Sequence, residues 1–177
     1  APTGGSLNIP SSGNASPYPS TIEVSGVSGT ISNLKVTIAN LSHTWPSDID
    51  MVLFGPTGAH SIIFTDAIGS STGITGRTYT FQTGATALPL SGYPASGTYG
   101  VVNGGSYSGS GTPSTVTNTG LGTFNGTNPN GTWSLYVYDQ TSGDIGSIGS
   151  WSLEIATDAL ATYVWSPATY LNNTAIA

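Results

Sequence analysis

The segment Asn-Pro-Asn-Gly-Thr-Trp-Ser-Leu-Tyr-Val-Tyr-Asp, residues 128–139, decides the fold class of this chain of 177 residues. Its first four residues are typical of a turn, because Asn, Pro and Gly accept the backbone angles that turns need. After the turn, Trp133, Leu135 and Val137 fall on one side of an extended chain, and the residues between them fall on the other. This period of two predicts a half-buried β-strand.

The same alternation recurs along most of the chain. It predicts a long strand in residues 29–41, where Leu34, Val36 and Ile38 share a face, and another in residues 151–155. Further predicted strands are residues 21–24, 49–54, 61–65 and 78–82. A Gly-Pro-Thr-Gly turn joins strands 49–54 and 61–65 as a hairpin. We expect loops at 66–77 and 83–120. No segment shows a clear helical period.

Composition agrees with an all-β fold. The chain has 25 glycines and 11 prolines spread along it, and both residues disfavour helix interiors. Abundant threonine favours strands. Apolar residues make up 37% of the chain, which is enough for a core and unlike a disordered sequence. We therefore expect one domain built as a sandwich or barrel.

Charge and cysteine content exclude several functions. With two basic residues and a net charge of −6, the chain lacks the positive patch that binds nucleic acid or anionic lipid. It has no cysteine, so it forms no disulfide, thiol nucleophile or thiolate metal site. No apolar run approaches the roughly 18 residues of a transmembrane helix.

We divide the chain into an extended Pro/Ser-rich arm at residues 1–20, a β-domain at residues 21–156 and a tail at residues 157–177. Few charges and many hydroxyls are commoner outside cells than inside. The first residue is Ala, which fits a processed secreted protein and equally fits a trimmed chain. We expect an extracellular or cell-surface protein.

Three stretches carry a family resemblance. They are Leu-Ser-His-Thr-Trp-Pro-Ser-Asp-Ile at 41–49, Leu-Phe-Gly-Pro-Thr-Gly at 53–58, and residues 128–153, where Gly-Asp-Ile-Gly-Ser-Ile and Trp-Ser-Leu follow the opening segment. In order and spacing they resemble the P domain (Homo B domain) of subtilisin-like proprotein convertases and their bacterial secreted relatives, over about residues 21–156.

The resemblance implies a jelly-roll β-sandwich of about eight antiparallel strands. It also implies a non-catalytic module, because many family members sit beside a protease domain and stabilise it. Trp133 and Trp151 would lie on the inward faces of adjacent strands and fill the core. Gly131 and Gly146 would supply backbone angles that other residues resist.

A hydrolase site is one candidate, because Ser42, His43 and Asp48 lie close together in sequence. No Gly-x-Ser-x-Gly elbow accompanies them, and in the resembled family this loop is structural. The chain has two histidines and no His-x-x-x-His pair, so a zinc enzyme is not expected. Lys35 lies in mid-strand rather than in a phosphate-binding loop. We predict that the protein is not an enzyme and requires no cofactor.

Carboxylates and glycosylation sequons are the remaining site candidates. Calcium takes six to eight oxygen ligands, and some bacterial relatives of the resembled family hold calcium; the candidate ligands are Asp48, Asp139, Asp144 and Asp50. The alternative is that these carboxylates only cap turns or face solvent. Candidate attachment sites for covalent glycans are Asn14, Asn40, Asn125, Asn130 and Asn172, together with Thr112, Ser114 and Thr115.

The tail beyond residue 156 resembles the opening strand of immunoglobulin-like repeats in large secreted proteins of Bacteroidetes-type bacteria. It contains Tyr163, Val164, Trp165, Tyr170 and Leu171. As a lone strand it would expose apolar side chains and unpaired backbone groups. It either folds back on its own domain, belongs to a longer chain that has been cut, or adds to the sheet of another copy.

From these features we predict a structural subunit of an extracellular bacterial filament that polymerises with copies of itself, head to tail, by terminal strand addition. The first alternative is an accessory P domain that stabilises or targets a subtilisin-like protease domain on the same chain. The second is a carbohydrate-binding jelly roll, in which Tyr93, Tyr99 or Tyr107 would stack on sugar.

Overall fold

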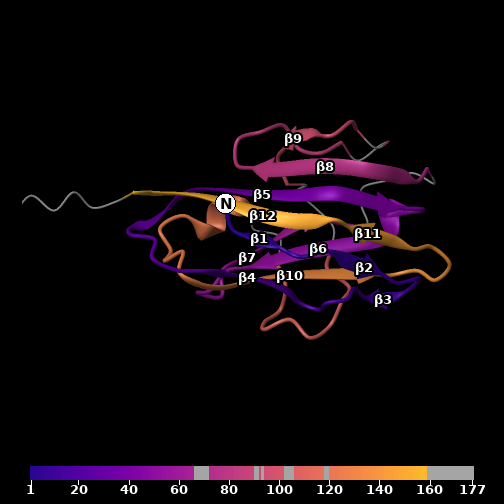
Figure 1. Cartoon of the computed structure of the whole chain (residues 1–177), viewed down its shortest axis with the longest axis horizontal. Helices are drawn as coiled ribbons and strands as arrows, with labels where there is room; N and C mark the ends of the chain where they lie inside the picture. The colour runs from indigo at the N-terminus through magenta and orange to yellow at the C-terminus, as the bar shows by residue number, and fades with distance from the viewer. Residues whose placement is uncertain (66–71, 90–91, 93, 102–105, 118–119, 159–177) are drawn as a thin grey trace, which may run out of the picture.

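The computed structural model describes residues 1–65, 72–89, 92, 94–101, 106–117 and 120–158. These residues form two β-sheets that face each other as a sandwich, as the sequence predicted (Figure 1). Pairing is antiparallel except between β8 and β9.

The larger sheet, here called sheet A, has seven strands. Its main order is β1 (Thr3–Gly4), β12 (Ser150–Asp158), β5 (Thr30–His43), β11 (Gly146–Ile148) and β2 (Leu7–Ile9), with β8 (Ile74–Gln82) also on β5 and β9 (Gly97–Tyr99) on β8. Sheet B has five strands: β3 (Gly13–Asn14), β10 (Gly131–Asp139), β6 (Ile49–Phe54) and β7 (His60–Phe64) in order, with β4 (Ser20–Val24) also on β10. Two 3₁₀ turns, η1 (Pro46–Asp48) and η2 (Leu121–Phe124), complete the elements of the described residues.

The predicted alternation holds in the long strands. Trp133, Leu135 and Val137 of β10 are buried, as the opening segment indicated, and β6 with β7 forms the predicted hairpin. Some strands differ from the prediction. β8 begins at Ile74, four residues before the predicted start, because Ile74 pairs with His43 after a register shift that the sequence does not reveal. β12 runs to Asp158 instead of ending at 155, and β9 lies within the predicted loop at 83–120.

Trp133 and Trp151 both fill the core, but they do not lie on adjacent strands. β10 belongs to sheet B and β12 to sheet A, so the two indoles enter the core from opposite sheets. Each ring N–H is satisfied: Trp133 donates to the Pro129 carbonyl at 2.9 Å and Trp151 to the Ser20 hydroxyl at 2.8 Å. The second bond links the two sheets.

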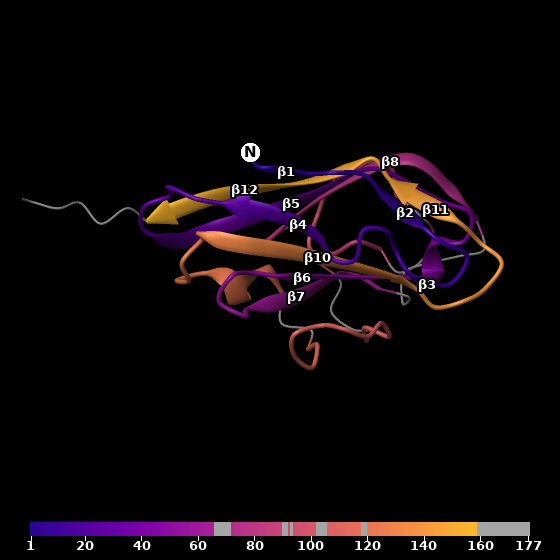
Figure 2. The ribbon, with the colours of Figure 1, turned by 60° about the horizontal axis from the view of Figure 1, so that its bottom comes forward.

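The N-terminal arm is extended, yet it packs against the domain. β1 adds to β12, β2 adds to β11, and β3 adds to β10 in the other sheet (Figure 2). Leu7 and Ile9 of the arm are buried in the main core. No strand was predicted in this arm from the sequence, although its Leu7-Asn8-Ile9 triplet has strand periodicity.

The two glycines singled out from the sequence act in different ways. Gly131 has a φ of +126°, and a Cβ there would lie 2.7 Å from the Pro56 side chain, so its backbone freedom is needed as predicted. Gly146 is required for space instead. A Cβ on it would lie 2.4 Å from the Ser42 carbonyl oxygen and 2.2 Å from the His43 ring.

Residues 106–117, here called the strap, cross the outer face of sheet B (Figure 2). Beneath the strap Val52, Phe54 and Tyr136 form a small second core, with Tyr107 and Val116 packed against it from the strap. Sheet B is thus buried on both faces at this point, and Tyr136, which alternation alone places on the outer side, is buried.

Candidate functional site

His43 and Asp139 form a buried pair at one end of the sandwich. His43 is the last residue of β5 and Asp139 the last of β10, and both side chains are fully buried. The His43 Nε2 and Asp139 Oδ2 atoms are 3.0 Å apart. Because Nδ1 of the same ring accepts the Trp45 backbone N–H at 3.1 Å, the ring proton belongs on Nε2, which donates to Asp139.

The second oxygen of Asp139 is also occupied, by the Thr141 backbone N–H at 3.0 Å. Burial raises the pKa of Asp139, and the Thr141 N–H and His43 oppose that rise. Asp48 lies close enough to interact with this carboxylate. The pKa of Asp48 is raised by burial and by repulsion from Asp139 and Asp144. The pair ties the loop after β5 to the loop after β10.

This arrangement does not support nucleophilic catalysis. A catalytic histidine needs one ring nitrogen free to take the proton of a nucleophile, and both nitrogens of His43 are already hydrogen-bonded. The Ser42 hydroxyl instead accepts the Gly76 backbone N–H at 2.9 Å. The Ser42, His43 and Asp48 combination considered from the sequence therefore forms no triad.

A shallow cleft of about 410 Å³ lies beside the pair. Hydroxyl-bearing and apolar side chains line it, including Ser42, Thr44, Ile74, Thr75, Ile145 and Ser147. The Thr44 backbone N–H donates to the Ile145 carbonyl at 3.2 Å, so the two cleft loops are joined. Ile145 at 62% and Trp45 at 40% are the exposed large hydrophobic residues among those described.

The structure does not bring the four candidate calcium ligands together. Asp139 pairs with Ile49 on β6, whereas Asp50 pairs with Tyr138, so alternation sends these two carboxylates to opposite faces of sheet B. Asp50 instead accepts bonds from the Ser108 backbone N–H and the Gln140 amide. Among the described residues no three acidic, His or Cys side chains are grouped to hold a metal. Calcium stays a prediction without support from this arrangement.

The glycosylation candidates divide by exposure. Asn14, Asn40, Asn125, Ser114 and Thr115 are exposed, Thr112 is half-buried, and Asn172 lies outside the described residues. Asn130 has a structural role: its Nδ2 donates to the Val27 carbonyl at 2.8 Å while its Oδ1 accepts the Val27 N–H at 2.9 Å. A glycan on Asn130 would have to break this contact.

The aromatic residues proposed for sugar binding do not share a face. Tyr99 lies on β9 of sheet A, where its hydroxyl donates to the Ala95 carbonyl at 3.0 Å. Tyr107 lies on the strap over sheet B, and its hydroxyl is 2.8 Å from that of Tyr18. Tyr93 and the tail residues Tyr163, Val164, Trp165, Tyr170 and Leu171 lie outside the described part of the chain.

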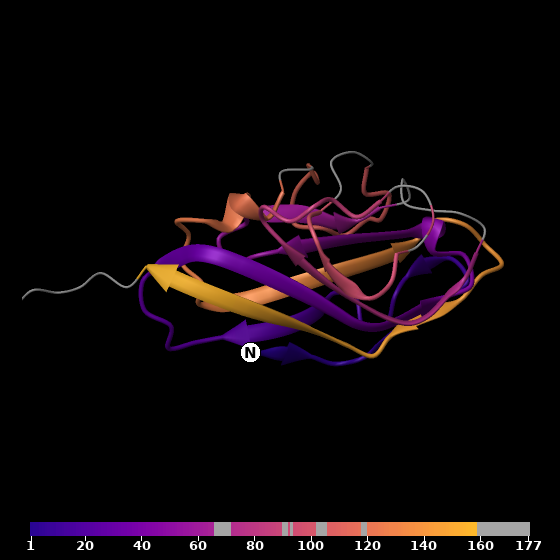
Figure 3. The same cartoon turned by 90° about the horizontal axis from the view of Figure 1, so that it is seen from above.

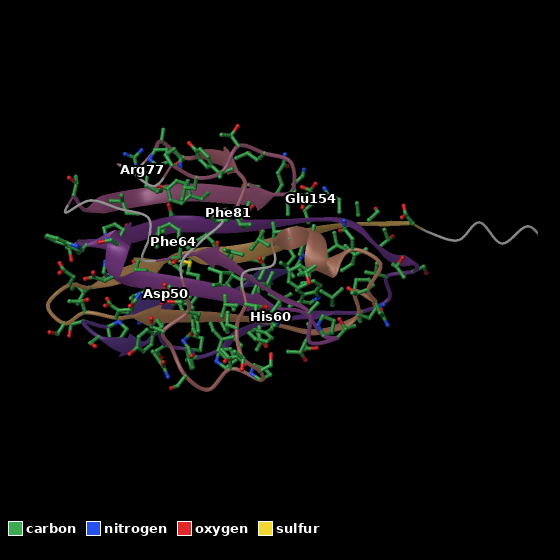
Figure 4. The ribbon with its side chains drawn as sticks, turned by 180° about the vertical axis from the view of Figure 1, so that it is seen from behind. Asp50, His60, Phe64, Arg77, Phe81 and Glu154 are labelled. Carbon is green, nitrogen blue, oxygen red and sulfur yellow. The ribbon has the colours of Figure 1, made fainter. Side chains whose placement is uncertain are left out.

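Sequence reasoning missed the strap and its anchors. Asp50 fixes the strap by accepting the Ser108 N–H at 2.9 Å, and His60 Nε2 accepts the Thr117 N–H at 3.1 Å (Figure 4). A signal for Asp50 was present, because a single carboxylate inside the apolar run Ile-Asp-Met-Val-Leu-Phe must find buried donors. Nothing near His60 in sequence indicates its distant partner.

Fold and site together define a β-sandwich module whose buried His–Asp pair is structural. The chain belongs to the proprotein convertase P-domain family, whose model matches residues 31–155. This confirms the resemblance drawn from the motifs.

A solved structure of the serine protease of Aeromonas sobria in complex with its chaperone ORF2 is 17% identical and has a TM-score of 0.45. That match covers 90% of this chain but only 27% of the other, so this chain spans about a quarter of that protein's length. No curated protein matches the sequence. In the described part of the chain, no helix is long and apolar enough to cross a membrane.

Proposed function

We propose that the protein is a non-catalytic accessory domain of a secreted subtilisin-like serine protease, which it stabilises by packing against the catalytic domain. Family membership over residues 31–155 carries this proposal. It replaces the filament subunit as the leading interpretation, because the family match favours the accessory domain. An extracellular location follows from this proposed role.

The chemistry of the buried pair supports an accessory role. His43 has no ring nitrogen free to act as a base, and the Ser42 hydroxyl is held by the Gly76 N–H of β8. The hydrogen bonds instead make the loops around residues 43–45 and 139–141 rigid, which suits a surface that must keep its shape on binding another domain.

Trp45 and Ile145 mark the surface best suited to that contact. Exposed aromatic and aliphatic residues are favoured at the centres of protein interfaces, and these two stand on loops that the Thr44–Ile145 hydrogen bond joins. The acidic residue Asp144 lies nearby and raises the pKa of both Asp48 and Asp139. We expect the facing protease surface to be apolar with basic residues at its rim.

The test is co-expression with the subtilisin-like catalytic domain encoded on the same polypeptide or in the same gene cluster. Thermal inactivation of peptidase activity is measured with wild-type chain, with Trp45→Ser/Ile145→Ser, and with a control, Ser114→Ala on the strap. The proposal expects a higher inactivation temperature with wild type and with the control, and a loss of that gain with the double variant. No gain with any chain would refute it. Labelling of the isolated chain by a fluorophosphonate would contradict its non-catalytic character.

A further inference from the structure

Strand β12 has an outer edge that is only partly paired. On one side it pairs with β5 along its whole length. On the other side it pairs with β1 at Trp151 and Ser152, and the Leu153 N–H donates to the Pro2 carbonyl at 3.2 Å. Figure 3 shows β12 running on past the N-terminus. Residues 155–158 thus present an edge to which no strand of the described residues is added.

The backbone groups at this edge can be assigned from the pairing. In antiparallel sheets, successive residues direct their N–H and C=O groups to alternate sides. Because the Leu153 N–H points to β1, those of Ile155 and Thr157 point the same way. The register shift near this end skips Ser32 on β5, so β12 itself stays regular. A regular open edge of this kind is a template for an added strand.

An apolar hollow adjoins the edge. It has a volume of about 390 Å³ and is lined by Ala1, Pro2, Val24, Val27 and residues 153–155. Trp151 and Leu153 are buried where β1 covers them, whereas Ile155 is only half-buried where that cover ends. The core is therefore incomplete at this corner, between β12 of sheet A and β4 of sheet B.

We propose that Thr162–Trp165 of the same chain adds to this edge as an antiparallel strand opposite residues 155–158. Like-facing residues must pair, so Trp165 lies opposite Ile155 and Tyr163 opposite Thr157. Trp165 then covers the hollow, with an aromatic surface suited to its apolar wall. The next residues are Ser166 and Pro167, and a proline cannot continue the ladder.

The length of the free edge supports this occupant. Among the described residues no strand is added to the four residues 155–158, and Thr162–Trp165 supplies four before the Ser-Pro pair. If the same pairing continued, Ser166 would lie opposite Glu154. Ala1 and Glu154 line the hollow together, so the N-terminus begins at this point of the edge. The added strand and β1 would thus occupy successive parts of one edge.

The effective concentration of the tail favours a strand from the same chain over a strand from a second copy. The connecting residues Ala159-Leu160-Ala161 contain no Gly or Asn, so a tight turn places a residue in the left-handed region at a cost of roughly 5- to 30-fold in population. A segment tethered by so short a linker has an effective concentration of about 1 mM. At about 1 μM protein that is a 1000-fold advantage, which exceeds the cost of the turn.

This inference is independent of the protease partner. An open strand edge invites association between copies, and a tail that closes it keeps the module monomeric. The same segment, displaced from its own edge at high concentration, could exchange between copies, which is the domain-swapped form of the contact.

The chain has no cysteine, so engineered pairs report directly on the register. Ala156→Cys/Val164→Cys places thiols on a non-hydrogen-bonded pair of the proposed ladder, where the Cα atoms are about 4.5 Å apart, within disulfide range. Ala156→Cys/Tyr163→Cys is the matched control, because its side chains point to opposite faces. Both full-length chains are oxidised at about 1 μM and compared by non-reducing electrophoresis and mass spectrometry.

The proposal expects at least tenfold more intrachain disulfide in the first chain than in the second, at monomer mass. Dimers or ladders would overturn the same-chain occupant and assign the edge to a second copy. Free thiols in both chains, or equal disulfide in both, would overturn the added strand altogether.

Hydrogen exchange gives a readout without cysteines. The amides of Ile155 and Thr157 should be protected in the full chain and exchange at least tenfold faster after Trp165→Ser. Thr169→Ser is the control and should leave both amides protected. Fast exchange of both amides in the wild-type chain would refute the proposal.

Discussion

The Asp50 carboxylate accepts the backbone N–H of Ser108 at 2.9 Å, across 58 residues of sequence. The same Oδ2 atom accepts the Gln140 amide at 3.0 Å. A fully buried carboxylate in the central part of sheet B is thereby satisfied by the strap that covers it. This hydrogen bond links the strap to sheet B, because Asp50 belongs to β6 and Ser108 to the strap.

Replacing Asp50 by alanine should therefore release the strap. The Ser108 N–H and the Gln140 amide lose their acceptor, at a cost of about 1–3 kcal/mol to the free energy that holds the strap. We expect faster hydrogen exchange at Ser108 and protease cleavage within residues 106–117. Ser114→Ala, an exposed change on the same strap, should leave both measurements as in wild type. Equal protection of Ser108 in Asp50→Ala would show that other contacts hold the strap.

A methyl group at position 146 should damage the site end of the sandwich. The added Cβ of Gly146→Ala would lie 2.2 Å from the His43 ring and 2.4 Å from the Ser42 carbonyl oxygen, so β5 and β11 must separate. We expect a loss of about 2 kcal/mol or more in the free energy of unfolding, measured by chemical denaturation. Gly122→Ala is the matched control, because nothing lies within 4 Å of its added Cβ. A loss below about 0.5 kcal/mol for Gly146→Ala would contradict the close approach.

The sequence predicts the strands well where one face is buried and the other exposed. Leu34, Val36 and Ile38 of β5 show the period of two and are buried as expected. The sequence predicts burial less well where contacts between residues far apart in the chain determine it. Tyr136 looks like an outward residue until the strap covers it, and the pairing of His43 with Asp139 joins residues 96 positions apart.

The candidate site illustrates the same division. The family motifs contain both His43 and Asp139, but they do not predict that the two side chains pair. Nor can they say that Asp50 and Asp139 face opposite sides of sheet B, because that depends on the register between β6 and β10. Gly146 was predicted to be needed, although for its backbone angles rather than for the space that it leaves for His43.

Removing a tryptophan of the core should lower the free energy of unfolding far more than removing the exposed tryptophan. Trp133 is fully buried against Phe124, with ring centroids 5.2 Å apart, and its N–H is bonded to Pro129. Trp133→Ala should lower the free energy of unfolding by about 3–5 kcal/mol. Trp45→Ala, at a side chain that is 40% exposed, should cost less than about 1 kcal/mol. Thermal and denaturant unfolding of both variants tests this order, and the reverse order would place the wrong indole in the core.

The acidic groups near the cleft should make stability depend on pH. The pKa of Asp48 is raised above its ordinary value of 3.8 by burial and by its acidic neighbours, and that of Asp139 is raised by burial. A carboxyl with a raised pKa binds its proton more tightly in the folded state than in the unfolded state. These two groups therefore favour folding most at low pH, and their contribution falls as pH rises from about 4 through the raised values.

Asp48→Asn should remove its part of this dependence. Because asparagine does not ionise, the variant should gain roughly 0.5 kcal/mol over wild type at pH 7 and less than that at pH 4, where a larger share of wild-type Asp48 is protonated. Thermal unfolding between pH 4 and pH 7 measures the difference. Glu23→Gln, an exposed change on β4 whose side chain can still accept the Thr132 hydroxyl, is the control and should follow the wild-type curve. A larger gain at pH 4 than at pH 7 would mean that Asp48 is stabilised, rather than strained, by its neighbours.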